Sequence, residues 1–85
     1  MMPLVTVKYL TVFSNITGKR EEKVKLNEGS KLRDLAFQLY KKYGREFEDH
    51  AKHALFLVNG RQVDMDEPLG HGDTVAISYP VGGGA

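Results

Sequence analysis

Hydrophobic and polar positions alternate with a period of two near the start of the chain, which predicts β-strands there. Val5 and Val7 fall on one face of the segment spanning residues 4–13, which is rich in β-branched and aromatic residues. Residues 22–27 alternate charged and apolar side chains in the same way. A polar connection over residues 15–20 separates the two segments. The pattern therefore predicts an N-terminal β-hairpin.

The hydrophobic period then changes from two to between three and four, which predicts a helix over residues 31–43. Its apolar stripe consists of Leu32, Leu35, Ala36, Leu39 and Tyr43. Ser30 is the expected N-cap, and Gly44 is the expected left-handed residue that ends the helix. Residues 45–53 are polar apart from Phe47, which favours a loop or a short helical extension.

A second hairpin is predicted from residue 54 onward. Residues 54–58 form a strand, and Asn59-Gly60 suits the positive φ angles of a tight type I′ turn. The chain returns through residues 61–63. The segments after it are a turn over residues 64–68, a single core residue at Leu69, a turn over residues 70–73 and a final strand over residues 74–79.

These elements predict one α+β domain over residues 1–80, followed by a flexible glycine-rich tail over residues 81–85. One helix cannot cover both faces of a sheet, so we expect a mixed four- to five-stranded sheet with one main helix packed on one face. The expected core consists of Val5, Val7, Val24, Leu26, Leu32, Leu35, Leu39, Phe56, Val58, Leu69, Val75 and Ile77.

Composition excludes several classes of function. The 12 basic and 11 acidic residues give a net charge of +1, without the clustered basic excess of a nucleic-acid-binding protein. The chain has no cysteine, so thiolate metal sites, disulfides and cysteine nucleophiles are excluded. The longest apolar run, residues 54–58, is too short to span a membrane, and no secretory signal is evident. We therefore expect a cytoplasmic protein.

Few residues suggest catalysis or metal binding. His50 and His53 have a spacing compatible with metal ligation on a helix, but no third ligand is evident and solvent exposure is the favoured interpretation. The acidic residues at 64, 66 and 67 lack the glycine and glutamate of a calcium loop and are interpreted as turn formers. The Gly-x-Gly at residues 70–72 precedes a strand rather than a helix. We expect neither a metal site nor an enzyme.

The C-terminal end of the chain is the exception. The final strand continues through Pro80 and Val81 into three consecutive glycines, residues 82–84, before Ala85. Glycines give a segment conformational freedom and no side-chain bulk, so such a tail can enter a narrow channel. Its terminal carboxylate is then available to another protein's active site as a reacting group. Glycine content alone is equally consistent with a terminus that has no role.

Three segments, together with the tail, carry a family resemblance over essentially the whole chain. They are residues 5–9, 56–61 and 69–77, which are similar to the first strand, the central strand with its turn, and the final turn and strand of the ubiquitin-like β-grasp sulfur carriers of the MoaD/ThiS family. Tyr79-Pro80-Val81-Gly82-Gly83-Gly84 is similar to the Pro-Val-x-Gly-Gly ending of the molybdopterin-synthase small subunit.

This resemblance implies a function for the tail. In the family, an ATP-using enzyme of the ubiquitin-activating type adenylates the C-terminal glycine carboxylate, which then becomes a sulfur-donating thiocarboxylate. By this resemblance Gly84 is the acyl carrier, and Val81, Gly82 and Gly83 are the residues by which the tail is recognised. The family ends at the second glycine, so Ala85 must be removed. The carrier binds no cofactor, since the partner enzyme uses the ATP.

The resemblance also implies partners. An activating enzyme grips the sheet face and the tail, so we expect a partner-binding surface at Leu57, Ser78, Tyr79 and Pro80. The expected partners are a ubiquitin-activating-like adenylyltransferase and a sulfur-accepting enzyme such as a molybdopterin synthase large subunit, without nucleic acid or membrane. The alternatives are a carrier for tRNA thiolation or thiamin synthesis, a ubiquitin-like modifier of lysines, and a β-grasp interaction module without chemistry.

Overall fold

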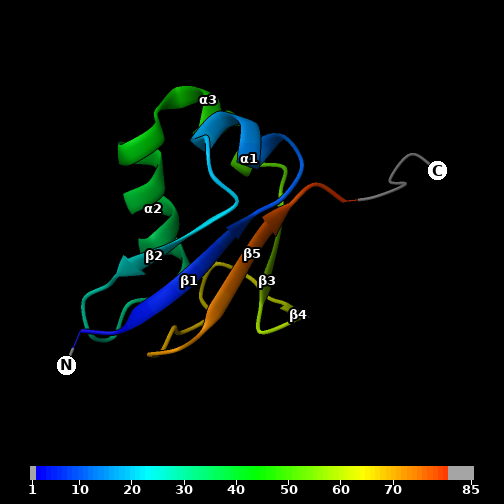
Figure 1. Cartoon of the computed structure of the whole chain (residues 1–85). Helices are drawn as coiled ribbons and strands as arrows, with labels where there is room; N and C mark the ends of the chain where they lie inside the picture. Colours follow the sequence, from blue (N-terminus) through cyan, green and yellow to red (C-terminus); the bar gives the residue numbers. More distant parts are fainter. Residues whose placement is uncertain (1, 81–85) are drawn as a thin grey trace.

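A computed structural model describes residues 2–80 and shows a five-stranded sheet with three helices (Figure 1). In chain order the elements are β1 (Leu4–Tyr9), α1 (Val12–Thr17), β2 (Glu21–Lys25), α2 (Leu32–Tyr43), α3 (Arg45–Ala51), β3 (Leu55–Val58), β4 (Arg61–Gln62) and β5 (Thr74–Ser78). The strand order is β2-β1-β5-β3-β4. The central strands β1 and β5 are parallel and the other pairs are antiparallel, which confirms the predicted mixed sheet.

The helices share one side of the sheet, with α2 as the longest of them (Figure 1). Burial alternates along each central strand, so that Val5, Val7, Val75 and Ile77 point to the helices and are fully buried. All twelve residues that the sequence placed in the core are buried. The core also contains Tyr9, Phe13, Ala36, Phe47 and Ala51, which the predicted core did not include.

The prediction for residues 10–20 is wrong in part, because a helix stands where the sequence predicted strand and loop. β1 ends at Tyr9 rather than at Phe13, and Thr11 adopts a positive φ of 53° before α1 begins. Phe13 is fully buried, although the predicted core did not include it. The polar residues of α1 satisfy the backbone locally, as Thr17 does by donating its hydroxyl to the carbonyl of Phe13 at 2.9 Å.

The start of α2 also differs from the prediction. Its N-cap is Lys31 and not Ser30, whose hydroxyl instead donates to the carbonyl of Asn27 at 2.6 Å. Oδ2 of Asp34 accepts the Lys31 N–H at 2.8 Å and so satisfies a backbone donor before the first turn. The predicted end is confirmed, since α2 stops before Gly44, whose φ is +92°.

Residues 45–53, left open between a loop and a short helical extension, contain helix α3. Phe47 anchors this helix and is fully buried. Its ring lies 5.5 Å from those of Phe13 and Tyr43, and 6.1–6.2 Å from those of Tyr9 and Tyr40. A single aromatic side chain therefore joins α3 to β1, α1 and α2, and such ring pairs add to the free energy of area burial.

The second hairpin is confirmed at the predicted turn. Asn59 and Gly60 have φ angles of 51° and 84°, as a type I′ turn requires at both central positions. The Asn59 side chain donates to Oδ1 of Asp73 and accepts the Thr74 N–H, both at 2.9 Å. This turn is therefore tied directly to the start of β5.

Candidate functional site

The described part of the chain ends at Pro80, two residues after β5 ends near α1 and α3 (Figure 1). Leu10 N–H donates to the carbonyl of Ile77 at 3.0 Å, and Ser78 is the last residue of β5, opposite Leu55 on β3. The chain thus leaves from the centre of the sheet, flanked on both sides by hydrogen-bonded strands. Predicted tail residues Val81, Gly82, Gly83 and Gly84, together with Ala85, lie outside the described residues, so their roles stay predictions.

Tyr79 connects this exit to the helices. Its ring centroid lies 5.5 Å from that of Phe13 on α1 and 5.6 Å from that of His50 on α3. Nδ1 of His50 and the Tyr79 hydroxyl share a hydrogen bond. Pro80, the next residue, is exposed.

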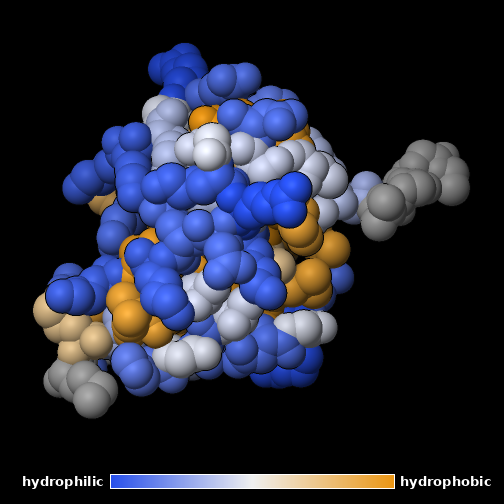
Figure 2. Space-filling view, in the orientation of Figure 1, coloured by the Kyte–Doolittle hydropathy of each residue, from blue (hydrophilic) through white to orange (hydrophobic). Residues whose placement is uncertain are grey.

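The opposite face of the sheet carries a small apolar surface beside the exit. Leu57 pairs with Ala76, and Leu55 pairs with Ser78, so these side chains point away from the helices in two adjacent rows. Leu10, at the end of β1, is 44% exposed. We call this surface the tail-side patch, and it consists of Leu10, Leu55, Leu57, Ala76 and Ser78. Figure 2 shows hydrophobic atoms gathered at the right of the view, beside the end of β5.

The four residues of the predicted partner surface therefore divide between two places. Leu57 and Ser78 lie in the tail-side patch and are partly buried. Tyr79 packs toward the helices, and Pro80 follows it along the chain. The sequence analysis missed Leu55 and Ala76, although each lies two positions from a predicted residue on the same strand, which is the signal that could have found them.

Glu22 on β2 carries a carboxyl group whose pKa lies well below its ordinary value. Its Oε2 accepts the hydroxyls of Tyr9 and Tyr43 at 2.5 Å each, and its Oε1 accepts Nζ of Lys42 at 2.8 Å. Partial burial alone would raise the pKa of Glu22, but the hydrogen bonds from Lys42 and the two tyrosines outweigh it and lower the pKa from 4.5 to about 2. Burial first, and then the carboxylate, raise the pKa of the Tyr9 hydroxyl above its ordinary range.

This Glu22 cluster ties β2 to α2 and has the features of a structural anchor. Every polar atom in it has a partner, and the acidic group is held ionised rather than poised to exchange a proton near neutral pH.

Of the two histidines whose spacing suggested a metal, His50 bonds to Tyr79 and His53 is exposed. His71, in the turn before β5, accepts the Leu4 N–H through its Nδ1 at 3.1 Å. Asp64 accepts the Asp66 N–H at 2.8 Å, as a turn-forming aspartate does. Within residues 2–80 no group of three potential ligands is close enough to hold a metal ion.

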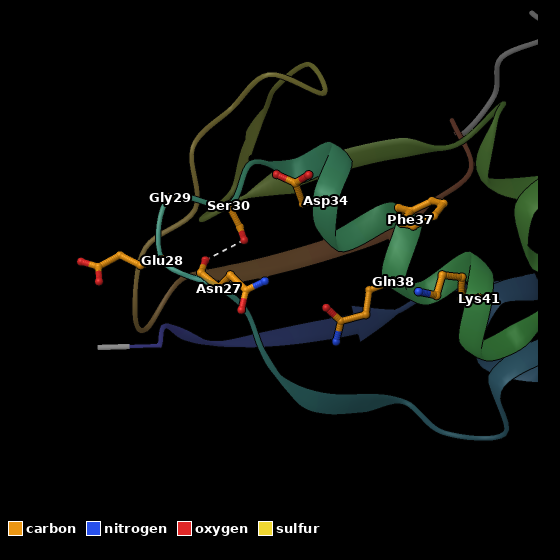
Figure 3. Close-up of a pocket in the computed structure, with 8 residues that line it drawn as sticks. All are labelled: Asn27, Glu28, Gly29, Ser30, Asp34, Phe37, Gln38 and Lys41. Atoms are coloured by element: carbon orange, nitrogen blue, oxygen red, sulfur yellow. Dashed lines mark hydrogen bonds between the residues drawn. The ribbon is translucent and has the colours of Figure 1, made fainter.

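A surface pocket of about 400 Å³ lies at the other end of the domain (Figure 3). It is lined by residues 27–30, which connect β2 to α2, and by Asp34, Phe37, Gln38 and Lys41 of α2. The Phe37 side chain is 61% exposed there, and Nζ of Lys41 lies 5.1 Å from its ring centroid. This pocket is remote from the tail exit and holds no cluster of catalytic groups.

Among the described helices, none is both long and apolar enough to cross a membrane.

Comparison with known proteins defines the class to which this architecture belongs. Small archaeal modifier protein 1 of Haloferax volcanii superposes with a TM-score of 0.83 at 20% identity, covering 93% of this chain and 99% of that one. The protein complex of subunits 1 and 2 of the molybdopterin-converting factor from Helicobacter pylori contains a chain that matches with a TM-score of 0.66 at 19% identity, covering 92% and 95%. The fold is thus the ubiquitin-like β-grasp that the sequence predicted.

The chain belongs to the ThiS family, whose model matches residues 7–84. It is also similar to a putative molybdopterin converting factor subunit 1 from Pyrococcus furiosus, with 32% identity, a TM-score of 0.80 and coverage of 93% of this chain and 99% of that chain. No curated protein sequence matches the chain significantly.

Proposed function

We propose that this chain is a sulfur carrier whose Gly84 carboxylate, exposed by removal of Ala85, is adenylated and then converted to a thiocarboxylate. One observation carries the proposal: the family match continues to Gly84 and stops before Ala85. The central strand β5 leads into this tail, and the tail-side patch lies next to its exit. A domain that binds a partner through this patch therefore also presents its tail to that partner.

The chemistry needs no catalytic side chain from the carrier. The Gly84 carboxylate attacks the α-phosphorus of ATP in the active site of a ubiquitin-activating-like adenylyltransferase, and pyrophosphate leaves. A hydrosulfide equivalent then attacks the acyl carbon, so that a C–S bond forms and the C–O bond to AMP breaks. In this proposal the carrier acts as a co-substrate rather than an enzyme, and the reaction takes place in the cytoplasm.

Molybdopterin synthesis is the pathway we favour. The Pyrococcus furiosus relative at 32% identity is named a molybdopterin converting factor subunit, and the Helicobacter pylori match is a complex of two such subunits. In this proposal the second partner is a molybdopterin synthase large subunit, which accepts the sulfur, and water supplies the oxygen that restores the Gly84 carboxylate. Carriers for tRNA thiolation or thiamin synthesis use the same activated glycine and differ only in the acceptor.

A second candidate function is that of a protein modifier, favoured by the likeness to small archaeal modifier protein 1. Here a lysine amine of a target protein, rather than hydrosulfide, attacks the activated Gly84 carbonyl, and an isopeptide bond forms as AMP leaves. The two functions share the first step and separate at the second.

The test uses three chains and the activating enzyme with ATP. The chain ending at Gly84 is expected to release pyrophosphate, whereas the chain ending at Ala85 and a chain lacking residues 83–85 are not. Retained folding of all three chains, measured by thermal unfolding, is the control. Pyrophosphate release from the chain lacking residues 83–85 would contradict the proposal. The absence of release from all three folded chains would also contradict it and would favour a β-grasp interaction module.

A further inference from the structure

The Tyr79 side chain is the last anchor in the described part of the chain before the tail. The β1–β5 ladder ends with the hydrogen bond from Leu10 to Ile77, and Ser78 is the final residue of β5. One residue later, Tyr79 lies against Phe13 of α1 and His50 of α3. The tail therefore starts from a residue that is held by its side chain and not by the sheet.

We propose that His50 and Tyr79 form a positioning pair that fixes the point from which the tail reaches the activating enzyme. This inference rests on the proposed function, since it assigns residues that prepare the same tail for adenylation. His50 and Tyr79 are positioning residues, because neither touches the reacting carboxylate in this account. They act by fixing the position of the Tyr79 backbone, from which the chain continues to Pro80.

His50 and Tyr79 lie at the edge of the hydrophobic core and are not part of it. Phe13, which backs the Tyr79 ring, is fully buried and packs on the equally buried Phe47 at 5.5 Å. His50 and Tyr79 are only partly buried and meet through polar atoms at the surface. The rigid aromatic cluster thus provides a fixed base, and the hydrogen bond sets the position of Tyr79 on it.

The backbone at Tyr79 and Pro80 restricts the exit further. Proline fixes its own φ near −65° and pushes the residue before it into an extended conformation. Few backbone conformations of Tyr79 are therefore allowed while its ring packs against Phe13. The direction in which the chain leaves the domain is defined by two adjacent residues together.

A fixed start matters because the tail is short. Gly84 is five positions after Tyr79, and an extended chain spans at most about 3.3–3.6 Å per residue, so the carboxylate can reach at most about 17 Å from Tyr79. When the β-grasp domain binds the activating enzyme through the tail-side patch, the carboxylate must reach the active site of that enzyme. Freeing Tyr79 enlarges the volume that the tail explores, lowers the effective concentration of the carboxylate at the site and lowers kcat/KM for activation.

The test compares His50→Ala, Tyr79→Phe and the double variant, all in the chain ending at Gly84. Tyr79→Phe keeps the ring on Phe13 and removes only the hydroxyl. His53→Ala is the matched control, because His53 is exposed and lies on the turn after α3. Two quantities are measured in each chain: the NMR order parameters of the Ser78 and Tyr79 amides, and kcat/KM for adenylation.

We expect each single variant to lower kcat/KM about three- to tenfold, the range for loss of one hydrogen bond. The double variant should lose no more than either single variant, because both remove the same bond. The order parameter of Tyr79 should fall in step, while His53→Ala changes neither quantity. A role in stability alone predicts a lower unfolding temperature with kcat/KM unchanged.

Two results would overturn the inference while leaving the proposed function intact. One is that the unsubstituted chain ending at Gly84 is adenylated and the variants match it in kcat/KM. The other is additive losses in the double variant, which would mean that the two side chains act separately. If the unsubstituted chain ending at Gly84 is not adenylated at all, the proposed function itself fails.

Discussion

The hydroxyl of Tyr43, near the end of α2, donates to Oε2 of Glu22 on β2 at 2.5 Å. The two residues are 21 positions apart, and the bond joins an edge strand to the main helix. Its strength depends on the charge of the carboxylate, since hydrogen bonds to ionised acceptors are about twice as strong as neutral ones. The stability of this domain is therefore linked to the protonation of Glu22.

Acid should destabilise the domain through this group. The folded-state pKa of Glu22 is about 2 against an ordinary value of 4.5, so its contribution is complete above about pH 4.5 and disappears as the pH falls toward 2. A shift of this size corresponds to about 3 kcal/mol in the free energy of unfolding. Denaturant unfolding between pH 7 and 2 measures it. A Glu22→Gln chain should lack this part of the pH dependence, and an identical slope in both chains would contradict the linkage.

Phe47 should be among the most costly core residues to truncate. It is fully buried and contacts four aromatic rings, so Phe47→Ala should lower the free energy of unfolding by about 3–5 kcal/mol. The matched control is Phe37→Ala on α2, which removes a side chain that is 61% exposed and should cost about 0.5 kcal/mol or less. Chemical denaturation of both chains checks this, and similar losses would show that Phe47 is not the anchor of α3.

The Asn59 turn gives a separate stability prediction. Asn59→Ala loses the bonds to Asp73 and Thr74 and places alanine at a φ of 51°, so we expect a loss of about 2 kcal/mol. The exposed Asn15 on α1 provides a control, since Asn15→Ala removes an asparagine with no comparable role. Equal unfolding midpoints for Asn59→Ala and Asn15→Ala would refute the prediction.

The tail-side patch should be needed for activation but not for folding. Leu57→Asp places a charge in the patch and should weaken binding to the activating enzyme at least about tenfold, as loss of a central apolar contact does. The control is Leu4→Asp, which makes the same change at another partly buried leucine on the same face of the sheet. Leu4 lies at the start of β1, away from the tail-side patch. Titration of the two chains with the enzyme distinguishes them, and equal affinities would place the docking surface elsewhere.

Periodicity predicted most of the sheet and helix α2, because these elements bury one face each and the pattern records which face. It failed over residues 10–20, where Phe13 is buried by a short helix whose polar residues favour a loop. The N-cap was assigned to Ser30 from its side-chain type, which does not show that its hydroxyl bonds to Asn27 instead. Local propensity gave way to tertiary packing at Phe13, and to a local hydrogen bond at Ser30.

The candidate site was predictable only in part. Alternation along the strands placed Leu57 and Ser78 on one face, and the glycines of the tail were visible in the sequence. The contact between His50 and Tyr79 was not, because 29 positions separate them and α3 itself was uncertain. The Glu22 cluster likewise depends on three elements that meet only in the folded chain.

The central claim is that Gly84 becomes a thiocarboxylate, and the intact mass of the protein from its own cells tests it most directly. With thiols protected during isolation, the account predicts a species that ends at Gly84 and carries one sulfur in place of one oxygen. A uniform, unmodified chain that ends at Ala85 and stays inert with activating enzyme and ATP would contradict the account.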